Sequence, residues 1–156
     1  MSAAIDLDLE HAVLSAISSV SDPEYPGVSI VDLGLLEHVE VRRGIAGIGL
    51  IPTFSGCPAL AMIKDDVAAA VEAVDGISSA SVEWLHSPAW TPARVSPRGR
   101  EALATEFTVA VEIGSSKPRC PLCEGPTVEQ SMFGPSRCRS VHRCESCSET
   151  IEVMRG

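Results

Sequence analysis

Two pairs of closely spaced cysteines near the end of the chain restrict its fold more than any other feature. The first pair lies in Cys120-Pro121-Leu122-Cys123, and the second, after twenty intervening residues, in Cys144-Glu145-Ser146-Cys147. Two residues between cysteines allow a tight turn, here called a knuckle, to direct both sulfur atoms toward one ion, and two knuckles complete a tetrahedron. The spacing predicts a zinc ribbon whose structural metal is bound by Cys120, Cys123, Cys144 and Cys147.

The four-cysteine motif does not by itself identify the metal. Four thiolates suit zinc, but they also suit a single iron ion or an iron–sulfur cluster. Cys138 and His142 lie between the two pairs. Because four better-spaced ligands are present, we expect Cys138 to be a reduced core cysteine and His142 to be a solvated side chain. About forty residues bury too little apolar surface to fold alone, so the metal must contribute free energy of folding.

A change in charge separates this tail from the rest of the chain. Residues 1–114 carry six Lys and Arg against sixteen Asp and Glu, whereas residues 115–156 carry six against five. The change coincides with a run of small and turn-forming residues, Gly114-Ser115-Ser116-Lys117-Pro118. We therefore expect an acidic domain over residues 1–114 and a four-cysteine ribbon over residues 115–156.

The overall composition excludes several classes of partner. The net charge is -9, which argues against nucleic acid or an anionic membrane as the main partner. No apolar stretch approaches the roughly eighteen residues that a membrane span needs. The first residues lack the basic flank and apolar run of a signal peptide. We expect a cytoplasmic protein, in which cysteines stay reduced and can bind metals.

Hydrophobic periodicity predicts alternating helices and strands before the tail. A first helix, capped by Asp6 or Asp8, is followed by an ordered loop at 28–34. The remaining expected elements are strands at 36–41 and 45–53, a helix at 58–74 with Met62 in its buried stripe, a strand at 80–85, a helix at 97–107 and an extended segment at 108–113. This order indicates an α+β fold, with a small three- to four-stranded sheet covered by helices on one face.

The best candidate for chemistry outside the tail is Cys57. It follows the apolar run that ends in Phe54-Ser55-Gly56 and precedes Pro58, which is tolerated in the first turn of a helix. The unpaired N–H groups and the dipole at a helix N-terminus favour a thiolate. A small buried cysteine that fills a turn explains the same spacing equally well.

Several motifs together resemble a known family. Asp22-Pro23-Glu24-Tyr25-Pro26 with residues 28–35, and Thr53-Phe54-Ser55-Gly56-Cys57-Pro58, resemble the two signatures of SufT-type iron–sulfur assembly domains. The Trp90-Thr91-Pro92 loop, Gly99-Arg100, and the ribbon with Phe133-Gly134 resemble a narrower group. That group is the PaaD component, also called PaaJ, of the phenylacetyl-CoA ring-epoxidase (phenylacetate-CoA oxygenase) system.

This resemblance implies an accessory role in phenylacetate catabolism, without catalytic activity of its own. The family is associated with maturation or repair of the iron–sulfur or diiron centres of the epoxidase. The implied partners are other subunits of the epoxidase, either the iron–sulfur reductase or the diiron oxygenase. The resemblance assigns transfer of iron or of a transient iron–sulfur cluster to Cys57, Asp22 and Glu24. One cysteine cannot hold a cluster alone, so the other ligands must come from a homodimer mate, a client or these carboxylates.

Two alternatives to this function remain open on the residues themselves. The chain could be a structural adaptor of the oxygenase complex, with Cys57 only packed in its turn. It could also be an enzyme with Cys57 as nucleophile, but such an enzyme needs an adjacent base, and the sequence offers no convincing histidine partner. For Asp22, Glu24 and Asp32, turn chemistry in a loop competes with a role in a site.

Overall fold

The computed structural model describes nearly the whole chain, namely residues 2–54, 56–114, 116–135 and 138–155. It divides into two compact units, Met1–Ala89 and Trp90–Gly156. This division lies upstream of the change in charge near Gly114. The assignment of residues 1–114 and 115–156 as separate domains therefore stays a prediction.

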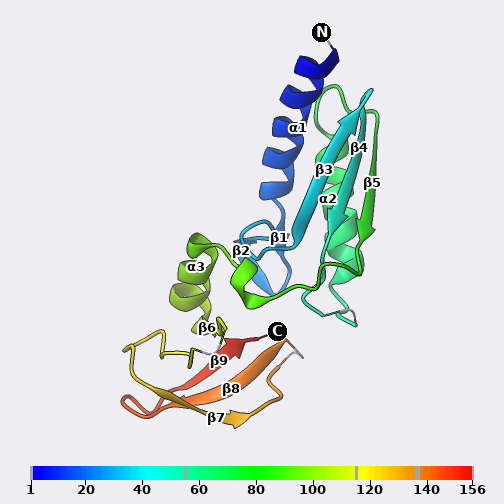
Figure 1. The fold of residues 1–156 in the computed structure, drawn as a ribbon. Coiled ribbons are helices and arrows are strands. Elements are labelled where there is room, and N and C mark those ends of the chain that lie inside the picture. Colours follow the sequence, from blue (N-terminus) through cyan, green and yellow to red (C-terminus); the bar gives the residue numbers. More distant parts are fainter. Residues whose placement is uncertain (1, 55, 115, 136–137, 156) are drawn as a thin grey trace. The chain divides into compact units, whose positions relative to one another are not determined.

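The first unit combines two helices, a three-stranded sheet and a short hairpin (Figure 1). Its elements are α1 (Ser2–Ser18), β1 (Ser21–Asp22), β2 (Tyr25–Ser29), β3 (Leu36–Arg42), β4 (Ile45–Leu50), α2 (Leu60–Glu72) and β5 (Ser79–Trp84). The sheet order is β3-β4-β5, with β3 antiparallel and β5 parallel to the central β4. The expected α+β class, with a small sheet and helices against it, is confirmed.

Local sequence explains both connections of this sheet. Between β3 and β4, Arg43 and Gly44 have φ values of 51° and 75°, and two left-handed residues are typical of a tight hairpin turn. A Cβ on Gly44 would lie 2.8 Å from the carbonyl oxygen of Gly76, so this position has no room for a side chain. Between β4 and β5, α2 provides the crossover that parallel strands require.

The core of the first unit lies between the helices and one face of the sheet. Ala46 and the last three residues of β4 are buried. α1 and α2 pack against each other and against the outer strands of the sheet (Figure 1). The buried helix positions follow a spacing of three or four residues, namely Val13, Ile17, Ile63, Val67 and Val71. The prediction for Met62 is wrong, because its side chain is 56% exposed.

Some predicted element boundaries also need correction. α1 begins at Ser2, so Asp6 and Asp8 lie inside the helix and do not cap it. The loop expected at 28–34 loses its first two residues to β2, which pairs with β1. β4 ends at Leu50, and the chain bends at Thr53 and Phe54. α2 begins at Leu60 rather than at Pro58.

The second unit places a helix and the cysteine knuckles around a four-stranded sheet. Its elements are a 3-10 helix η1 (Pro92–Arg94), α3 (Pro97–Phe107), β6 (Val109–Val111), β7 (Thr127–Ser131), β8 (Arg139–Cys144) and β9 (Thr150–Met154). The sheet order is β6-β9-β8-β7 (Figure 1). β6 runs parallel to β9, whereas β7, β8 and β9 form an antiparallel meander.

The predicted helix at 97–107 is confirmed with its cap. The N–H of Gly99 donates to Ser96 Oγ at 2.9 Å, which satisfies one of the free donors at the helix start. Thr108 ends the helix in a left-handed conformation with φ of 56°. The extended segment that follows becomes β6, so it joins the ribbon sheet. Trp90 is buried, as expected for a core residue.

Candidate metal centre and the Cys57 turn

The four ribbon cysteines meet at one point, as their spacing predicts. Their sulfur atoms all lie within 4.8 Å of one another. Cys120 Sγ lies 3.7 Å from Cys147 Sγ, and Cys123 Sγ lies 3.4 Å from Cys144 Sγ. A tetrahedral zinc ion with Zn–S bonds of about 2.3 Å requires sulfur atoms about 3.8 Å apart. The cluster therefore fits a single tetrahedral ion.

The two knuckles are conformational copies of each other. In the first, the N–H of Cys120 donates to the Gly125 carbonyl, and the N–H of Glu124 donates to the Cys120 carbonyl. In the second, the N–H of Cys144 donates to the Glu149 carbonyl, and the N–H of Ser148 donates to the Cys144 carbonyl. Glu124 and Ser148 both adopt a left-handed φ, 63° and 66°. This shared turn directs the sulfurs of each pair to the same side.

Gly125 allows the two knuckles to approach closely. A Cβ at this position would lie 2.6 Å from Ser146 Oγ and 3.1 Å from Cys144 Sγ. Beside it, the N–H of Glu145 donates to the Pro126 carbonyl at 2.9 Å, which links the second knuckle to the end of the first. Gly125 was not among the predicted site residues, although a glycine two residues after a C-x-x-C pair was visible in the sequence.

The electrostatics of the cluster favour a bound cation. The backbone N–H groups of Cys147 and Ser146 donate to Cys144 Sγ at 3.4 Å and lower the pKa of this thiol to about 6. The backbone contact with Glu149 lowers the pKa of Cys147, but partial desolvation and the neighbouring thiols outweigh it and raise this pKa to about 12. A divalent ion among four thiolates removes this conflict, because metal-bound thiols are deprotonated.

Cys138 and His142, which lie between the two cysteine pairs, both differ in burial from the expectation. His142 is only 5% exposed, so it is a core residue and not a solvated one. Cys138 is half-buried rather than part of the core. Neither belongs to the cluster of metal-ligating atoms found among the described residues, which contains the four cysteines alone. Burial lowers the pKa of His142, against the opposite influence of the Glu129 and Glu112 carboxylates.

Cys57 occupies a turn between β4 and α2. Its N–H donates to the Phe54 carbonyl at 3.2 Å, and its own carbonyl accepts from the N–H of Leu60 at 3.3 Å. Cys57 is half-buried and stands three residues before the first residue of α2. A Cβ on Gly56 would lie 2.8 Å from the Phe54 ring, so the ring covers this glycine. Ser55 lies outside the described residues.

The end of the sheet that carries this turn is held together by hydrogen bonds. The N–H of Leu85 donates to the Leu50 carbonyl, and the N–H of Ile51 donates to the Leu35 carbonyl, both at 2.7 Å. The indole N–H of Trp84 donates to the carbonyl of Leu60 at 3.3 Å, just beyond Cys57. Trp84 therefore anchors the start of α2, close to the cysteine.

The predicted acidic site residues lie in loops of the first unit. Asp22 and Glu24 are in the β1–β2 turn, where the N–H of Glu24 donates to Asp22 Oδ1 at 2.8 Å. This bond shows that Asp22 acts in turn formation. Asp32 lies in the loop between β2 and β3, which reaches the Cys57 end of the sheet through the bond between Ile51 and Leu35. A shared site of Asp22, Glu24 and Cys57 stays a prediction.

Comparison with known proteins separates the chain into two matched regions. Residues 10–84 match the family described as "Iron-sulfur cluster assembly protein", and residues 105–155 match the family described as "PaaD zinc beta ribbon domain". A protein of Escherichia coli (strain K12), named as one of the subunits of 1,2-phenylacetyl-CoA epoxidase, is 31% identical over 93% of this chain and 92% of its own length. The chain belongs to this PaaD family. The resemblance inferred from the motifs is confirmed.

Two shorter relatives match only part of this PaaD family member. The Fe-S protein maturation auxiliary factor YitW of Bacillus subtilis (strain 168) is 31% identical over 63% of this chain and 96% of its own length. The Fe-S protein maturation auxiliary factor SufT of Staphylococcus aureus (strain USA300) is 34% identical over 54% of this chain and 96% of its own length. Part of this chain thus matches each of these relatives over nearly its whole length.

Solved structures show the same fold. A domain of unknown function, DUF59, from Bacillus anthracis superposes with a TM-score of 0.62 at 29% identity, over 67% of this chain and 99% of that domain. A conserved hypothetical protein of Thermotoga maritima superposes with a TM-score of 0.52 at 32% identity, over 59% of this chain and 90% of that protein. Within the part of the chain that the structure describes, no helix is long and apolar enough to cross a membrane.

Proposed function

We propose that this chain is a non-catalytic accessory protein that helps to mature or repair the iron–sulfur or diiron centres of a phenylacetyl-CoA epoxidase. The observation that carries the proposal is the separation of its thiols. Four cysteines form one closed cluster in the ribbon, whereas Cys57 is the single cysteine of the region that matches iron–sulfur assembly proteins. The match to the Escherichia coli epoxidase protein over nearly the whole chain supports the epoxidase as the client.

The metal of the ribbon is proposed to be structural zinc. Four protein thiolates leave no open coordination position for chemistry, and the sulfur separations suit one tetrahedral ion. Cys120 and Cys144 are 1% exposed and pack with Ile151 and Val153. The metal would therefore act as part of the core of the ribbon and would not be cargo.

Cys57 is proposed to act by ligand exchange, without a change of oxidation state. Its thiolate would form one Fe–S bond as a donor ligand leaves, and that bond would break when a client ligand replaces it. One thiolate fills one coordination position, so the client, a second copy of this chain, or Asp22 and Glu24 must fill the others. The half-buried turn supports this role, because a transfer ligand must be reached by its partner.

The test is maturation of the client in the presence of variants of this chain. The oxygenase and the reductase would be co-expressed with wild-type protein or with Cys57→Ser, and their iron content and specific activity would be measured. Cys138→Ser is the matched control, because Cys138 is also a half-buried cysteine outside the metal cluster. We expect Cys57→Ser to lower client iron content and Cys138→Ser to leave it unchanged.

The same experiment separates maturation from an adaptor role. An adaptor would co-purify with the oxygenase at fixed stoichiometry, and client iron content would be the same with Cys57→Ser as with wild type. That result would overturn the transfer proposal. The name of the Escherichia coli relative, which makes it part of the epoxidase itself, is the observation that favours the adaptor.

The carboxylates can be tested without loss of their turn. Asp22→Asn keeps an oxygen that can accept from the Glu24 N–H but removes the negative charge. If Asp22 is a ligand for iron, this variant should lower client iron content, although the turn is retained. If Asp22 serves only the turn, Asp22→Asn should behave as wild type.

A further inference from the structure

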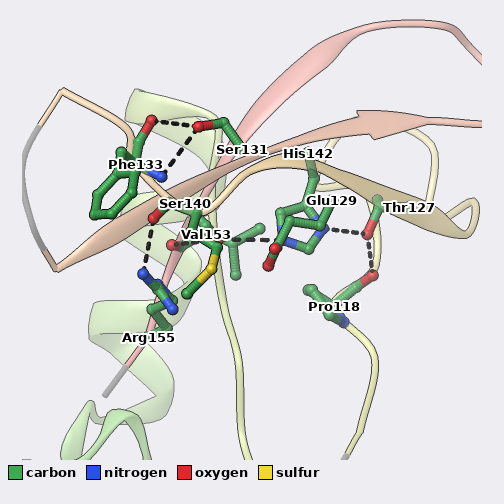
Figure 2. Close-up of polar contacts among 10 residues, drawn as sticks. Pro118, Thr127, Glu129, Ser131, Phe133, Ser140, His142, Val153 and Arg155 are labelled. Carbon is green, nitrogen blue, oxygen red and sulfur yellow. Dashed lines mark hydrogen bonds and ion pairs between the residues drawn. The ribbon is translucent and has the colours of Figure 1, made fainter.

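A chain of hydrogen bonds runs through the buried part of the ribbon (Figure 2). The Thr127 hydroxyl lies 2.7 Å from the Pro118 carbonyl oxygen and 3.3 Å from His142 Nδ1. The other ring nitrogen, Nε2, lies 3.1 Å from Ser140 Oγ. Thr127, Ser140 and His142 are all buried, with exposures of 8%, 0% and 5%. Polar groups at such positions destabilise a core unless their hydrogen bonds are made.

The direction of each bond follows from the available protons. The Pro118 carbonyl can only accept, so the single Thr127 hydroxyl proton is donated to it. Thr127 Oγ1 must then accept from His142, which places a proton on Nδ1 of the imidazole. In the neutral ring Nε2 is left as the acceptor. The Ser140 hydroxyl lies 3.1 Å from Nε2 and 3.5 Å from the Val153 carbonyl oxygen, so its proton is assigned to Nε2, the nearer of the two acceptors. Each member of this chain therefore has a defined role.

This chain of bonds spans both knuckles. Pro118 lies two residues before Cys120, and Thr127 is the first residue of β7 after the first knuckle. Thr127 is the register partner of Cys144. His142 and Cys144 occupy alternate buried positions of β8, so their side chains lie on the same face of the sheet.

We propose that Thr127 and His142 are positioning residues for the metal centre. They bind the segment that enters the first knuckle to the strand that enters the second, and this fixes the separation of the two cysteine pairs. The inference depends on metal binding by the ribbon and is independent of the role proposed for Cys57.

One observation and one physical argument separate this role from others that a buried histidine could have. His142 is absent from the cluster of ligating atoms found among the described residues, so it does not act as a fifth ligand. An apolar residue would fill the core as well, whereas a fully bonded hydroxyl and imidazole define one geometry. Partners outside the ligand shell that orient ligands in this way typically alter metal affinity by about 10- to 100-fold.

The test is zinc affinity of the full chain with conservative variants. Thr127→Val removes the hydroxyl and keeps the side-chain shape, whereas Thr127→Ser keeps the hydroxyl. Competition with a chromogenic chelator would give the dissociation constant of zinc. We expect Thr127→Val and His142→Phe each to weaken binding by about 10- to 100-fold. Thr127→Ser should retain affinity close to that of wild type, and the double variant should lose less than the product of the two single losses.

Cobalt(II) substitution supplies a readout that a packing role alone would not change. The d–d absorption of the tetrahedral cobalt thiolate site should shift in Thr127→Val and return in Thr127→Ser. Thr105→Val is the matched control, because Thr105 is an exposed threonine on α3 whose hydroxyl also bonds a carbonyl; it should leave affinity and spectrum unchanged.

The outcomes distinguish this inference from the proposed zinc site itself. If wild type binds zinc tightly and Thr127→Val binds within twofold of it with an unshifted cobalt spectrum, the positioning role is overturned. Equal losses in Thr127→Val and Thr127→Ser would overturn it too. If the wild-type chain binds neither zinc nor cobalt, the metal site and the positioning role both fail.

Discussion

The two units of this protein use cysteine in tight turns in opposite ways. In the ribbon, two copies of one turn bring four sulfur atoms within 4.8 Å and bury one thiol of each pair. In the first unit, a single half-buried cysteine stands between β4 and α2, with no second cysteine in residues 1–89. A closed set of ligands retains its ion, whereas a single ligand can only share one. The same side chain therefore suits permanent binding in one unit and exchange in the other.

The largest expected effect is loss of the ribbon metal. Cys120→Ser replaces a thiol that is 1% exposed, and a structural zinc contributes about 10–16 kcal/mol in small zinc modules at neutral pH. We expect zinc content to fall from about one per chain to near zero. Hydrogen exchange should then show lost protection in β7, β8 and β9, while β3, β4 and β5 stay protected. Equal loss of protection in both sheets would mean that the units do not differ in their dependence on metal.

Acidification provides a second way to remove the metal. Thiols must lose their protons to bind zinc, so affinity should fall as the pH falls. Elemental analysis after dialysis over a pH series should show zinc leaving wild-type protein at acidic pH. Iron in place of zinc in protein purified without added metal would contradict the assignment of zinc.

A core substitution in the first unit should produce the reverse pattern. Ile63 is 2% exposed on α2, and its neighbour Met62 is 56% exposed. Ile63→Ala should destabilise the first unit by about 2–5 kcal/mol through lost burial and the cavity that remains. Met62→Ala should change stability by less than about 0.5 kcal/mol. Thermal unfolding would measure both, and zinc content should remain near one per chain in each variant.

The sequence predicted the elements of the first unit well, because helix and strand periods differ and the turns are marked by glycine and proline. It failed at Met62, which is next to the buried Ile63 in sequence but is rotated from it by about 100° around the helix, and so is exposed. The β1–β2 hairpin was also missed. Its strands are two and five residues long, too short to show a period.

A smaller effect is expected where the knuckles approach each other. Gly125→Ala would place a methyl group 2.6 Å from Ser146 Oγ, and such overpacking typically costs about 1–3 kcal/mol. Zinc affinity should fall, as measured by chelator competition. Adding Ser146→Gly should restore part of the loss, because it removes the nearest atoms. No rescue would indicate that Cys144 Sγ, 3.1 Å away, is the deciding contact.

The smallest effect on structure is expected from Cys57→Ser. The side chain is half-buried, and serine is close to cysteine in size, so stability should change by less than about 1 kcal/mol. Zinc content should be unchanged. Anaerobic reconstitution with iron and sulfide should nevertheless give a weaker charge-transfer absorption than wild type. Identical absorption in both would contradict a role of Cys57 in binding the cargo.

The candidate sites were predictable to different degrees. The C-x-x-C spacing identified all four cysteines of the ribbon cluster, because two residues between cysteines suit one turn geometry. The burial of His142 was not predicted, since nothing in the local sequence shows that this side chain lies on the buried face of its strand, next to Thr127. Cys57, Asp22 and Glu24 depend on loops from distant segments, and spacing along the chain carries no information about how such loops meet.

The pairing of β6 with β9 determines which fragment of this protein can be transferred to another protein as a folded unit. The change in charge near Gly114 suggests that residues 115–156 could be grafted onto another protein. That fragment would lack Val109–Val111 and would expose the edge of β9, a template for pairing with other chains. The portable unit therefore begins at Trp90 and includes α3. In evolutionary terms, a ribbon acquired by fusion would have to bring its own helix and edge strand with it.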